Sequence, residues 1–362
     1  MRLGELCNIC SGGTPKRSVA EYWNDGAIPW VKISDISSKY VAETEECITE
    51  AGLNGSSAKM LDPGTLLYSI FASIGAVGIL EMPAATNQAI AALSIKAESV
   101  DRDYLYHFLK SREALAKSTG RGAAQNNINL TILREMMVPV PSAVVQELIV
   151  EQLETVLNQI ESAKAQLESL DALVKSRFAE MFGDAGWPVA TVGSLAVDVR
   201  YGTSKKASDC GQYVYLRMNN MTDDGRLNLD DVKHIDLNGP ELEKCRVVDG
   251  DLLFNRTNSR EKVGKTVVFH ERKPMVIAGY IIRVRLGDRI RPDFLATYMN
   301  LPTTKAMLRS IAKGAVHQAN INSRELSAIE VPVPPMELQD RFLSFVAQVD
   351  KSRFVVRNKS QL

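Results

Sequence analysis

The chain has 362 residues, of which 45% are apolar and 24% charged, and its formal net charge is zero. This length allows two domains that each bury a core, and the composition is that of a soluble globular protein. Neutrality argues against a function built on strong attraction to nucleic acid, unless a partner protein supplies positive charge. The five cysteines, with no basic and apolar leader before them, lead us to expect a cytoplasmic protein without a disulfide framework.

Residues 1–143 form the first predicted domain. Apolar and β-branched runs such as 28–33 and 65–71 are separated by turn residues, whereas 103–116 have the apolar spacing of a helix. Short strands between turns favour an antiparallel or mixed sheet. The sequence therefore predicts an α+β domain with a mainly antiparallel sheet.

Residues 144–186 predict a long helix that separates two domains. Ser142 is a plausible N-cap and Gly183 a helix stop, which gives a helix of about 37 residues, or roughly 55 Å at 1.5 Å per residue. Apolar residues recur at alternating spacings of three and four, as in the seam of a coiled coil. The seam consists of Leu153, Val156, Ile160, Ala163, Leu167, Leu170 and Val174.

Residues 187–335 repeat the first domain, since Asn127-Ile128-Asn129 recurs as Asn320-Ile321-Asn322, 193 positions later. A period near 190 residues is too long for a solenoid, so it indicates a duplicated α+β domain. Further strands are expected at 212–218, 266–270 and 276–286, and a helix at 292–312. Other matches are 3–17 with 192–206, which sets Gly13, Thr14, Lys16 and Arg17 against Gly202, Thr203, Lys205 and Lys206; 63–68 with 249–254; and 103–109 with 293–299.

The repeat also argues against a membrane-spanning segment in the first domain. Residues 63–80 carry no charge over 18 positions, which is about the length that crosses a bilayer. The matching residues 249–266 include five charged side chains between Arg256 and Lys265. Because one position cannot face lipid in one copy and carry charge in the other, we expect buried strands with exposed loops.

Residues 336–362 predict a second, shorter helix. Its Phe342, Val346 and Val349 match Ile149, Leu153 and Val156 of the central helix, so we expect the two helices to pack antiparallel in a pseudo-twofold arrangement. The alternative is that the central helix packs on a domain surface. Its narrow apolar stripe and otherwise polar faces favour the helix pair.

Charge is distributed unevenly along the chain. Residues 187–335 contain 22 Lys and Arg against 17 Asp and Glu, whereas residues 1–143 contain 13 against 15. Residues 256–291 contain ten cationic side chains but only three acidic ones, Glu261, Glu271 and Asp288. This segment is a candidate phosphate-facing surface. Arg283 and Arg285 share one face of a strand, and a solvated face without a ligand remains equally open for them.

Motifs for catalysis fail on inspection. SREKVGKT (259–266) ends like a phosphate-binding loop, but Ser259 occupies the place of the first glycine that turns such a loop. Cys7 and Cys10 have the spacing of half a zinc site, yet no second close pair follows, so we expect no metal. The four histidines are scattered. We expect a chain that recognises something and has no chemistry of its own.

An ordered series of motifs resembles the specificity (S) subunits of type I restriction-modification systems. The series is SGGTPKR (11–17), IPWVKISDI (28–36), TNQAI (86–90), GAAQNNINLTIL (122–133) followed by VPVP (138–141), and a heptad helix ending in KSRFAEMFGD (175–184). The second copy departs from it, with YGTSKK at 201–206 where the motif would have GGTPK.

The resemblance implies two target recognition domains that each read half of an asymmetric, interrupted sequence in double-stranded DNA. The paired helices would fix the gap and dock two modification (M) subunits, and restriction (R) subunits would join through that core. We expect the chain to direct adenine methylation and restriction without catalysis, with S-adenosylmethionine, ATP and Mg bound by its partners. The short C-terminal helix leaves part of the central seam for M subunits or for self-association with a second copy.

Residue roles follow from the resemblance and the residues together. Side chains after the repeated glycines are assigned to DNA phosphates, which position a protein without reading sequence. Base reading should lie where the copies differ, and the window 255–262 against 69–76 offers Arg and Asn, which pair bidentately with guanine and adenine. The phosphate set is Lys16, Arg17, Arg121, Lys205, Lys206 and Lys313; the base-reading set is Arg256, Asn258, Arg260 and Lys262; and Gln125, Asn127, Gln318 and Asn320 are polar loop contacts.

Alternatives remain for these residues and for the whole chain. The polar residues of the repeated block, such as Asn127 and Asn320, could equally be capping and turn residues. As a whole, the chain could be a DNA-recognition subunit, a protein-binding scaffold with a coiled-coil spacer, or a nucleotide hydrolase acting through GKT (264–266).

Overall fold

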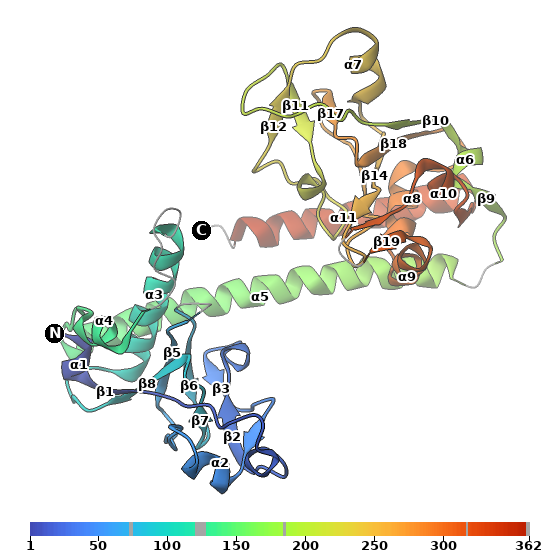
Figure 1. Cartoon of the computed structure of the whole chain (residues 1–362). Helices are drawn as coiled ribbons and strands as arrows, with labels where there is room; N and C mark the ends of the chain where they lie inside the picture. The colour runs from blue at the N-terminus through green and yellow to red at the C-terminus, as the bar shows by residue number, and fades with distance from the viewer. Residues whose placement is uncertain (72–74, 120–127, 184–185, 316–317, 360–362) are drawn as a thin grey trace. The chain divides into compact units, whose positions relative to one another are not determined.

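The computed structural model describes residues 1–71, 75–119, 128–183, 186–315 and 318–359 (Figure 1). They divide into two compact units, Met1–Gln159 and Ile160–Leu362, and the division falls inside helix α5 (Ala143–Phe182). Each unit has its own sheets and its own hydrophobic core. The predicted bounds 1–143, 144–186, 187–335 and 336–362 remain a prediction.

The first unit is built on a five-stranded sheet and a smaller three-stranded one. The larger has the order β1 (Cys7–Ser11), β8 (Ile90–Ile95), β5 (Leu66–Ser69), β6 (Val77–Leu80), β3 (Tyr40–Val41), and the smaller has the order β4 (Cys47–Ile48), β2 (Ile28–Val31), β7 (Ala85–Thr86). Neighbours pair antiparallel except β3 with β6 and β2 with β7. The unit also contains α1 (Leu3–Leu6), η1 (Ala20–Tyr22), η2 (Ile33–Asp35), α2 (Glu50–Asn54), α3 (Arg102–Thr119) and α4 (Leu130–Glu135).

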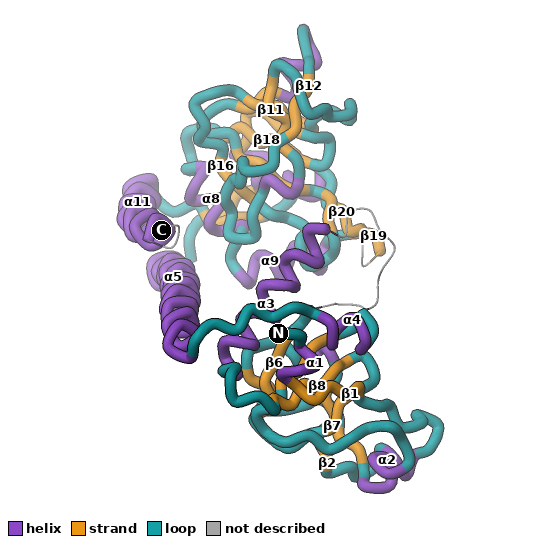
Figure 2. The backbone as a smooth tube through the Cα atoms, turned by 90° about the vertical axis from the view of Figure 1, so that its left-hand side faces the viewer, coloured by secondary structure: helices purple, strands orange, loops and turns teal. Residues whose placement is uncertain are grey.

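The second unit has two four-stranded sheets. One is β10 (Ala196–Tyr201), β18 (Ile281–Leu286), β14 (Leu252–Asn255), β16 (Thr266–Val268), and the other is β12 (Lys233–Ile235), β11 (Tyr213–Leu216), β17 (Met275–Ile277), β13 (Arg246–Val247). A small sheet joins β15 (Thr257–Asn258), β20 (Gln318–Asn320) and β19 (Lys313–Ala315), and β21 (Glu330–Pro332) pairs with β9 (Val189–Thr191). The helices of this unit are α6 (Val192–Leu195), η3 (Met218–Asn220), α7 (Gly239–Cys245), α8 (Pro292–Met299), α9 (Pro302–Ile311), α10 (Ser323–Ser327) and α11 (Met336–Lys359). Figure 2 labels α8, α9 and α11 among them.

The strand order repeats between the units, which confirms the predicted duplication of an α+β domain. The order β1-β8-β5-β6 matches β10-β18-β14-β16, and the parallel pair β2 and β7 matches the parallel pair β11 and β17. The repeated turn before β5 and β14 uses Gly64 at φ 87° and Gly250 at φ 85°, a conformation that glycine adopts at little cost. The uncharged run 63–80 forms β5 and β6, and no described helix is long and apolar enough to span a membrane.

The register of the repeat near each domain's start is one residue off from the sequence alignment. The backbone N–H of Gly12 donates to the carbonyl of Ile90, and that of Gly202 donates to the carbonyl of Ile281. In the same way, the N–H of Gly13 donates to the carbonyl of Thr86, and that of Thr203 donates to the carbonyl of Ile277. Gly12 therefore matches Gly202, because a Cβ there would lie 2.2 Å and 2.1 Å from a backbone oxygen of the facing strand. The predicted pairing of Gly13 with Gly202 is therefore wrong, and the same offset continued along the chain matches Lys16 with Lys206 instead of Lys205.

Helices α5 and α11 pack antiparallel within the second unit, as predicted (Figure 1). Residues 171, 177 and 178 of α5 meet residues 353, 345 and 342 of α11, in reverse order. Phe178 and Phe182 stack with Phe294 of α8 and Phe342 of α11, with ring centroids 5.0 to 6.3 Å apart. This aromatic cluster anchors both helices to the domain.

Two details of the predicted helices are corrected. Helix α5 has 40 residues, and the predicted seam is buried only in its second half: Ala163 and Val174 are buried, whereas Leu153 and Val156 are 41% and 52% exposed. The helix predicted at 292–312 is two helices, since Pro302 begins α9 and proline does not continue a helix.

Candidate nucleic-acid interface

The loop that follows β1 carries Lys16, and two tryptophan side chains hydrogen-bond to its backbone. Trp30 donates its indole N–H to the carbonyl of Gly13 at 3.0 Å, and Trp23 donates to the carbonyl of Lys16 at 3.2 Å. Arg17 lies over the ring of Trp23 at 3.6 Å and pairs with Glu46 at 2.6 Å. The guanidinium of Arg17 is thus already engaged, whereas Lys16 is exposed and has no ion pair within the described residues.

The matching loop of the second domain has the same design with different residues. Tyr215 donates its hydroxyl to the carbonyl of Thr203 at 3.0 Å, as Trp30 does to Gly13. Lys205 pairs with Glu241 at 2.5 Å. Lys206 is exposed, and the described part of the chain offers it no ion pair. Of the predicted phosphate contacts in these two loops, Lys16 and Lys206 are therefore the cations available to a ligand.

The structure brings the predicted base-reading window beside the repeated block. In the small sheet, Thr257 pairs with Asn320 and Asn258 with Ala319. Arg256 donates from Nε to Oδ1 of Asn320 at 3.2 Å, and its guanidinium lies 4.9 Å from the centre of the Tyr201 ring. Residues about 60 positions apart in sequence thereby form one polar surface patch.

The four predicted base readers differ in how freely they could contact a base. Asn258 accepts a hydrogen bond from the backbone of Ser259, and Arg260 donates to the carbonyl of Ala312 at 3.0 Å. Arg260 and Lys262 are exposed, while Arg256 and Asn258 are half-buried. An arginine has five N–H donors, so Arg256 and Arg260 retain donors for a further partner.

The repeated block contains both capping and surface residues. Asn129 and Asn322 accept from the backbone N–H groups of Ile132 and Glu325, and so cap α4 and α10. Lys313 is 80% exposed but pairs with Glu325 at 2.7 Å, and Gln318 is exposed. Arg121, Gln125 and Asn127 lie outside the described residues.

The basic segment 256–291 is only partly a surface. Arg283 is 2% exposed and pairs with Asp198, and Arg285 pairs with Asp251 at 2.8 Å. For Arg283 both the solvated-face and the phosphate-facing interpretations are wrong, because its charge is paired inside the domain. The side chain of Arg285 is 36% exposed, so its interpretation as part of a solvated face stays a prediction. Lys265 donates to the carbonyl of Met221 at 3.0 Å and pairs with Asp223 at 2.9 Å, so GKT (264–266) presents no free lysine for a phosphate.

Sequence reasoning missed the aromatic supports of this interface. Trp23, Trp30, Tyr201 and Tyr215 hold the loops and the arginine, yet none was singled out as functional. Trp30 lies in the quoted motif at 28–36, so a signal was present, although aromatic residues in a strand ordinarily indicate a core.

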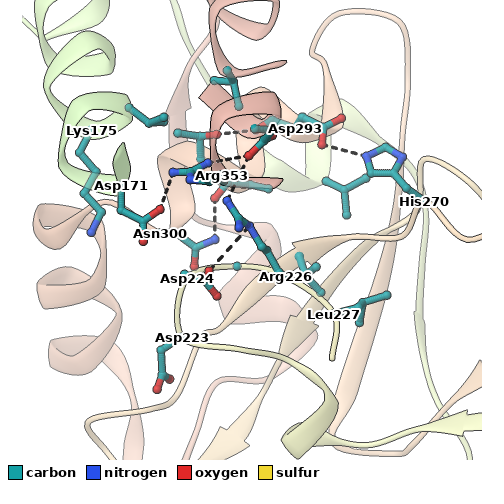
Figure 3. A pocket seen from close by; sticks show the side chains of 18 of the residues that line it. Asp171, Lys175, Asp223, Asp224, Arg226, Leu227, His270, Asp293, Asn300 and Arg353 are labelled. Atoms are coloured by element: carbon teal, nitrogen blue, oxygen red, sulfur yellow. Dashed lines mark hydrogen bonds and ion pairs between the residues drawn. The ribbon is translucent and has the colours of Figure 1, made fainter. Parts of the chain in front are cut away.

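A cavity of about 350 Å³ lies where α5, α11 and the second domain meet (Figure 3). Arg353 of α11 pairs with Asp171 of α5 and with Asp350, and Arg226 of the domain pairs with Asp350 at 3.1 Å. Its mixed charges largely neutralise one another, so we interpret it as a joint. The described residues contain no group of His, Cys, Asp and Glu suited to a metal, and Cys7 and Cys10 pack in different hydrophobic clusters.

His270 at this joint predicts a pH dependence. Hydrogen bonds to Asp293 at 2.9 Å and to Asp249 at 2.8 Å raise its pKa from 6.5 to about 9. A raised pKa contributes stability that is complete below pH 6.5 and is lost as the pH rises through 9,. We expect the Tm of the wild-type chain to fall between pH 6.5 and 9 as His270 loses its proton. The Tm of the His270→Gln variant, measured by thermal unfolding, should fall less over the same range. Parallel curves for both proteins would contradict the assignment.

The chain belongs to the family of the type I restriction modification DNA specificity domain, whose model matches residues 1–172 and again residues 187–361. The predicted family is confirmed. Among curated proteins, the chain is similar to the specificity subunit of the type I restriction enzyme EcoR124I/EcoR124II of Escherichia coli, with 32% identity over 42% of this chain and 39% of that protein. It is also similar to the EcoKI specificity subunit of Escherichia coli K12, with 24% identity over 68% of this chain and 58% of that protein.

Solved structures share the fold. The S subunit of a type I restriction-modification system from M. genitalium matches 100% of this chain and 91% of that chain with a TM-score of 0.53 at 13% identity. A structure described as showing complex assembly and conformational transition of the type I system matches 100% of this chain and 92% of that chain with a TM-score of 0.58 at 18% identity. These likenesses confirm the predicted fold class.

Proposed function

We propose that this chain is the DNA-recognition subunit of a type I restriction-modification complex, in which each domain reads one half of an interrupted target. The observation that carries this proposal is the duplication: two domains of one strand order, each matching the DNA specificity domain, are joined to long helices. Two similar readers can recognise two half-sites only if something sets their separation. The helices are suited to that role.

The charge distribution of the described surface supports contact with DNA. Lys16 and Lys206 occupy matched, exposed positions in the two domains, where they can neutralise phosphates. Arg260, Lys262 and Gln318 are exposed around the β15–β20 patch, which suits direct contact with base edges. Neutrality of the whole chain fits a subunit that binds DNA together with basic partners.

The proposal includes partners and the absence of catalysis. Two M subunits and R subunits would supply methylation and cleavage, and would bind S-adenosylmethionine, ATP and Mg, in the cytoplasm. We expect the purified chain alone neither to methylate nor to cut DNA. An electrophoretic shift that requires the M subunit and S-adenosylmethionine supports a recognition subunit, whereas protein binding without any DNA shift supports a scaffold. Nucleotide binding in calorimetry would support a hydrolase.

Substitutions in the two classes of contact should behave differently. Replacing Arg256, Asn258 or Arg260 by Ala should relax one half-site only, at about 1 to 3 kcal/mol for each lost bidentate pair. Lys16→Ala should weaken all sequences alike and lower the slope of log K against log salt by about 0.9. Affinity measured over a salt series with M subunit, together with methylation sequencing, tests both. An unchanged methylated sequence in all three patch variants would place the reading surface elsewhere.

A further inference from the structure

Two buried glutamines occupy matched places near the starts of the two long helices. Gln146 of α5 is 1% exposed and Gln339 of α11 is 0% exposed. They are 193 positions apart, the same offset as the repeated Asn-Ile-Asn block. Buried glutamine is uncommon and requires partners for its amide.

Both glutamines make the same three hydrogen bonds. The Nε2 of Gln146 donates to the carbonyls of Ser99 at 2.8 Å and Pro141 at 2.9 Å, and its Oε1 accepts from the N–H of Asp101 at 2.9 Å. The Nε2 of Gln339 donates to the carbonyls of Arg289 at 3.3 Å and Pro334 at 2.8 Å, and its Oε1 accepts from the N–H of Arg291 at 2.8 Å.

The partners come from equivalent segments of each domain. Asp101 and Arg291 directly precede α3 and α8, and Pro141 and Pro334 lie in the segment that leads into α5 and α11. One side chain therefore ties together the domain's helix, the exit segment and the long helix. Both amide hydrogens and the carbonyl oxygen are used, so the amide has one orientation and the helix has a fixed direction at its exit.

Neighbouring contacts at the two joints differ. Lys39 pairs with Asp103 and with Glu154 of α5 in the first unit, whereas Arg291 pairs with Asp340 of α11 at 2.7 Å in the second. The glutamine pattern persists although these charges do not. The two domains would read different bases, but both are joined to a long helix. Hydrogen bonds that occur in both domains are therefore more readily explained by the joint with the helix than by the reading of bases.

We propose that Gln146 and Gln339 are a matched pair of positioning residues that fix the angle between each recognition domain and its helix, so that the complex accepts one gap length between half-sites. This inference rests on the proposed function. An apolar residue of similar size would leave an N–H and two carbonyls of the buried joint unpaired. The joint could then adopt neighbouring angles, and neighbouring gap lengths would become acceptable.

The test uses Gln146→Met and Gln339→Met in the full chain with its M subunit. Affinity is measured for duplexes that carry both half-sites at the native gap and at gaps one base pair shorter and longer. We expect preference for the native gap to fall about tenfold in each variant, equivalent to about 1.4 kcal/mol, with the bases preferred in each half-site unchanged. The exposed Gln152 of α5 provides the control, and Gln152→Met should keep the native preference.

The outcomes separate this inference from the proposed function. Folded variants that keep the wild-type gap preference would overturn the positioning role alone, whereas a wild-type complex that reads no interrupted target would overturn both. If the Met variants do not fold, amide hydrogen exchange of the wild-type chain decides. The N–H groups of Asp101 and Arg291 should exchange as slowly as those of the central strands β8 and β18, and exchange at the rate of exposed loops would overturn the inference.

Discussion

Deleting one heptad of α5, Ala163 to Ser169, should shorten the unread gap of the target while both half-sites stay the same. The deletion removes about 10 Å of helix and turns the rest of the helix by only about 20°, because seven residues make nearly two turns. It spares Leu170 to Phe182, where α5 contacts α11 and the aromatic cluster. At about 3.4 Å per base pair, the gap should shorten by about three base pairs if the helix lies along the DNA axis, and by less if it is inclined.

Methylation sequencing of cells that express the deletion with its M subunit measures the gap directly. A five-residue deletion, Ala163 to Leu167, is the matched control: it removes about 8 Å but turns the second unit by about 140°. We expect this control to be inactive, since its two domains could not face the same duplex. A heptad deletion that stays active with an unaltered gap would refute the role of α5 as a spacer.

The largest stability effect should come from the aromatic cluster that joins the helix pair to the second domain. Phe178 is 3% exposed and contacts Phe182, Phe294 and Phe342 at ring-centroid distances of 5.0 to 5.3 Å. Phe178→Ala should lower the free energy of unfolding by about 3 to 5 kcal/mol, because it removes apolar burial and leaves a cavity among side chains of three helices.

Urea denaturation followed by tryptophan fluorescence measures this loss, because Trp187 lies 6.4 Å from the ring of Phe182 and reports on the same core. Leu173 of the same helix is 47% exposed, so Leu173→Ala should change the free energy of unfolding by less than about 0.5 kcal/mol. Equal effects of the two substitutions would show that the cluster does not hold the unit together.

The sequence by itself determined the duplication, the long helix and the family. Repetition of residues such as Asn127-Ile128-Asn129 survives in the linear order, and the spacing of apolar residues reports a helix without reference to its neighbours. The antiparallel helix pair was also predictable, because each helix has an apolar stripe that needs a partner and the two stripes can cover each other. The spacing of apolar residues could not show which half of the α5 seam is buried.

Side-chain engagement was decided only by the tertiary structure. In sequence, Arg283 and Lys16 are both cations in candidate loops or strands, but Arg283 is paired inside the domain and Lys16 is exposed. The register of the repeat around Gly12 and Gly202 depended on which backbone groups hydrogen-bond to each other. A sequence alignment that is shifted by one residue looks almost as good as the correct one, so it cannot show this register. Local periodicity specifies elements, whereas pairing between residues far apart in the chain depends on packing.

The same reason explains the glutamines. Gln146 and Gln339 stand in helices rich in polar residues, and in the sequence only their shared offset of 193 positions distinguishes them from the exposed Gln152. Their burial and their three hydrogen bonds arise from the docking of each helix against the segment before α3 or α8. The sequence determined that two similar domains are joined to helices; the tertiary structure decided which contacts make each joint, because these contacts link segments that the sequence keeps apart.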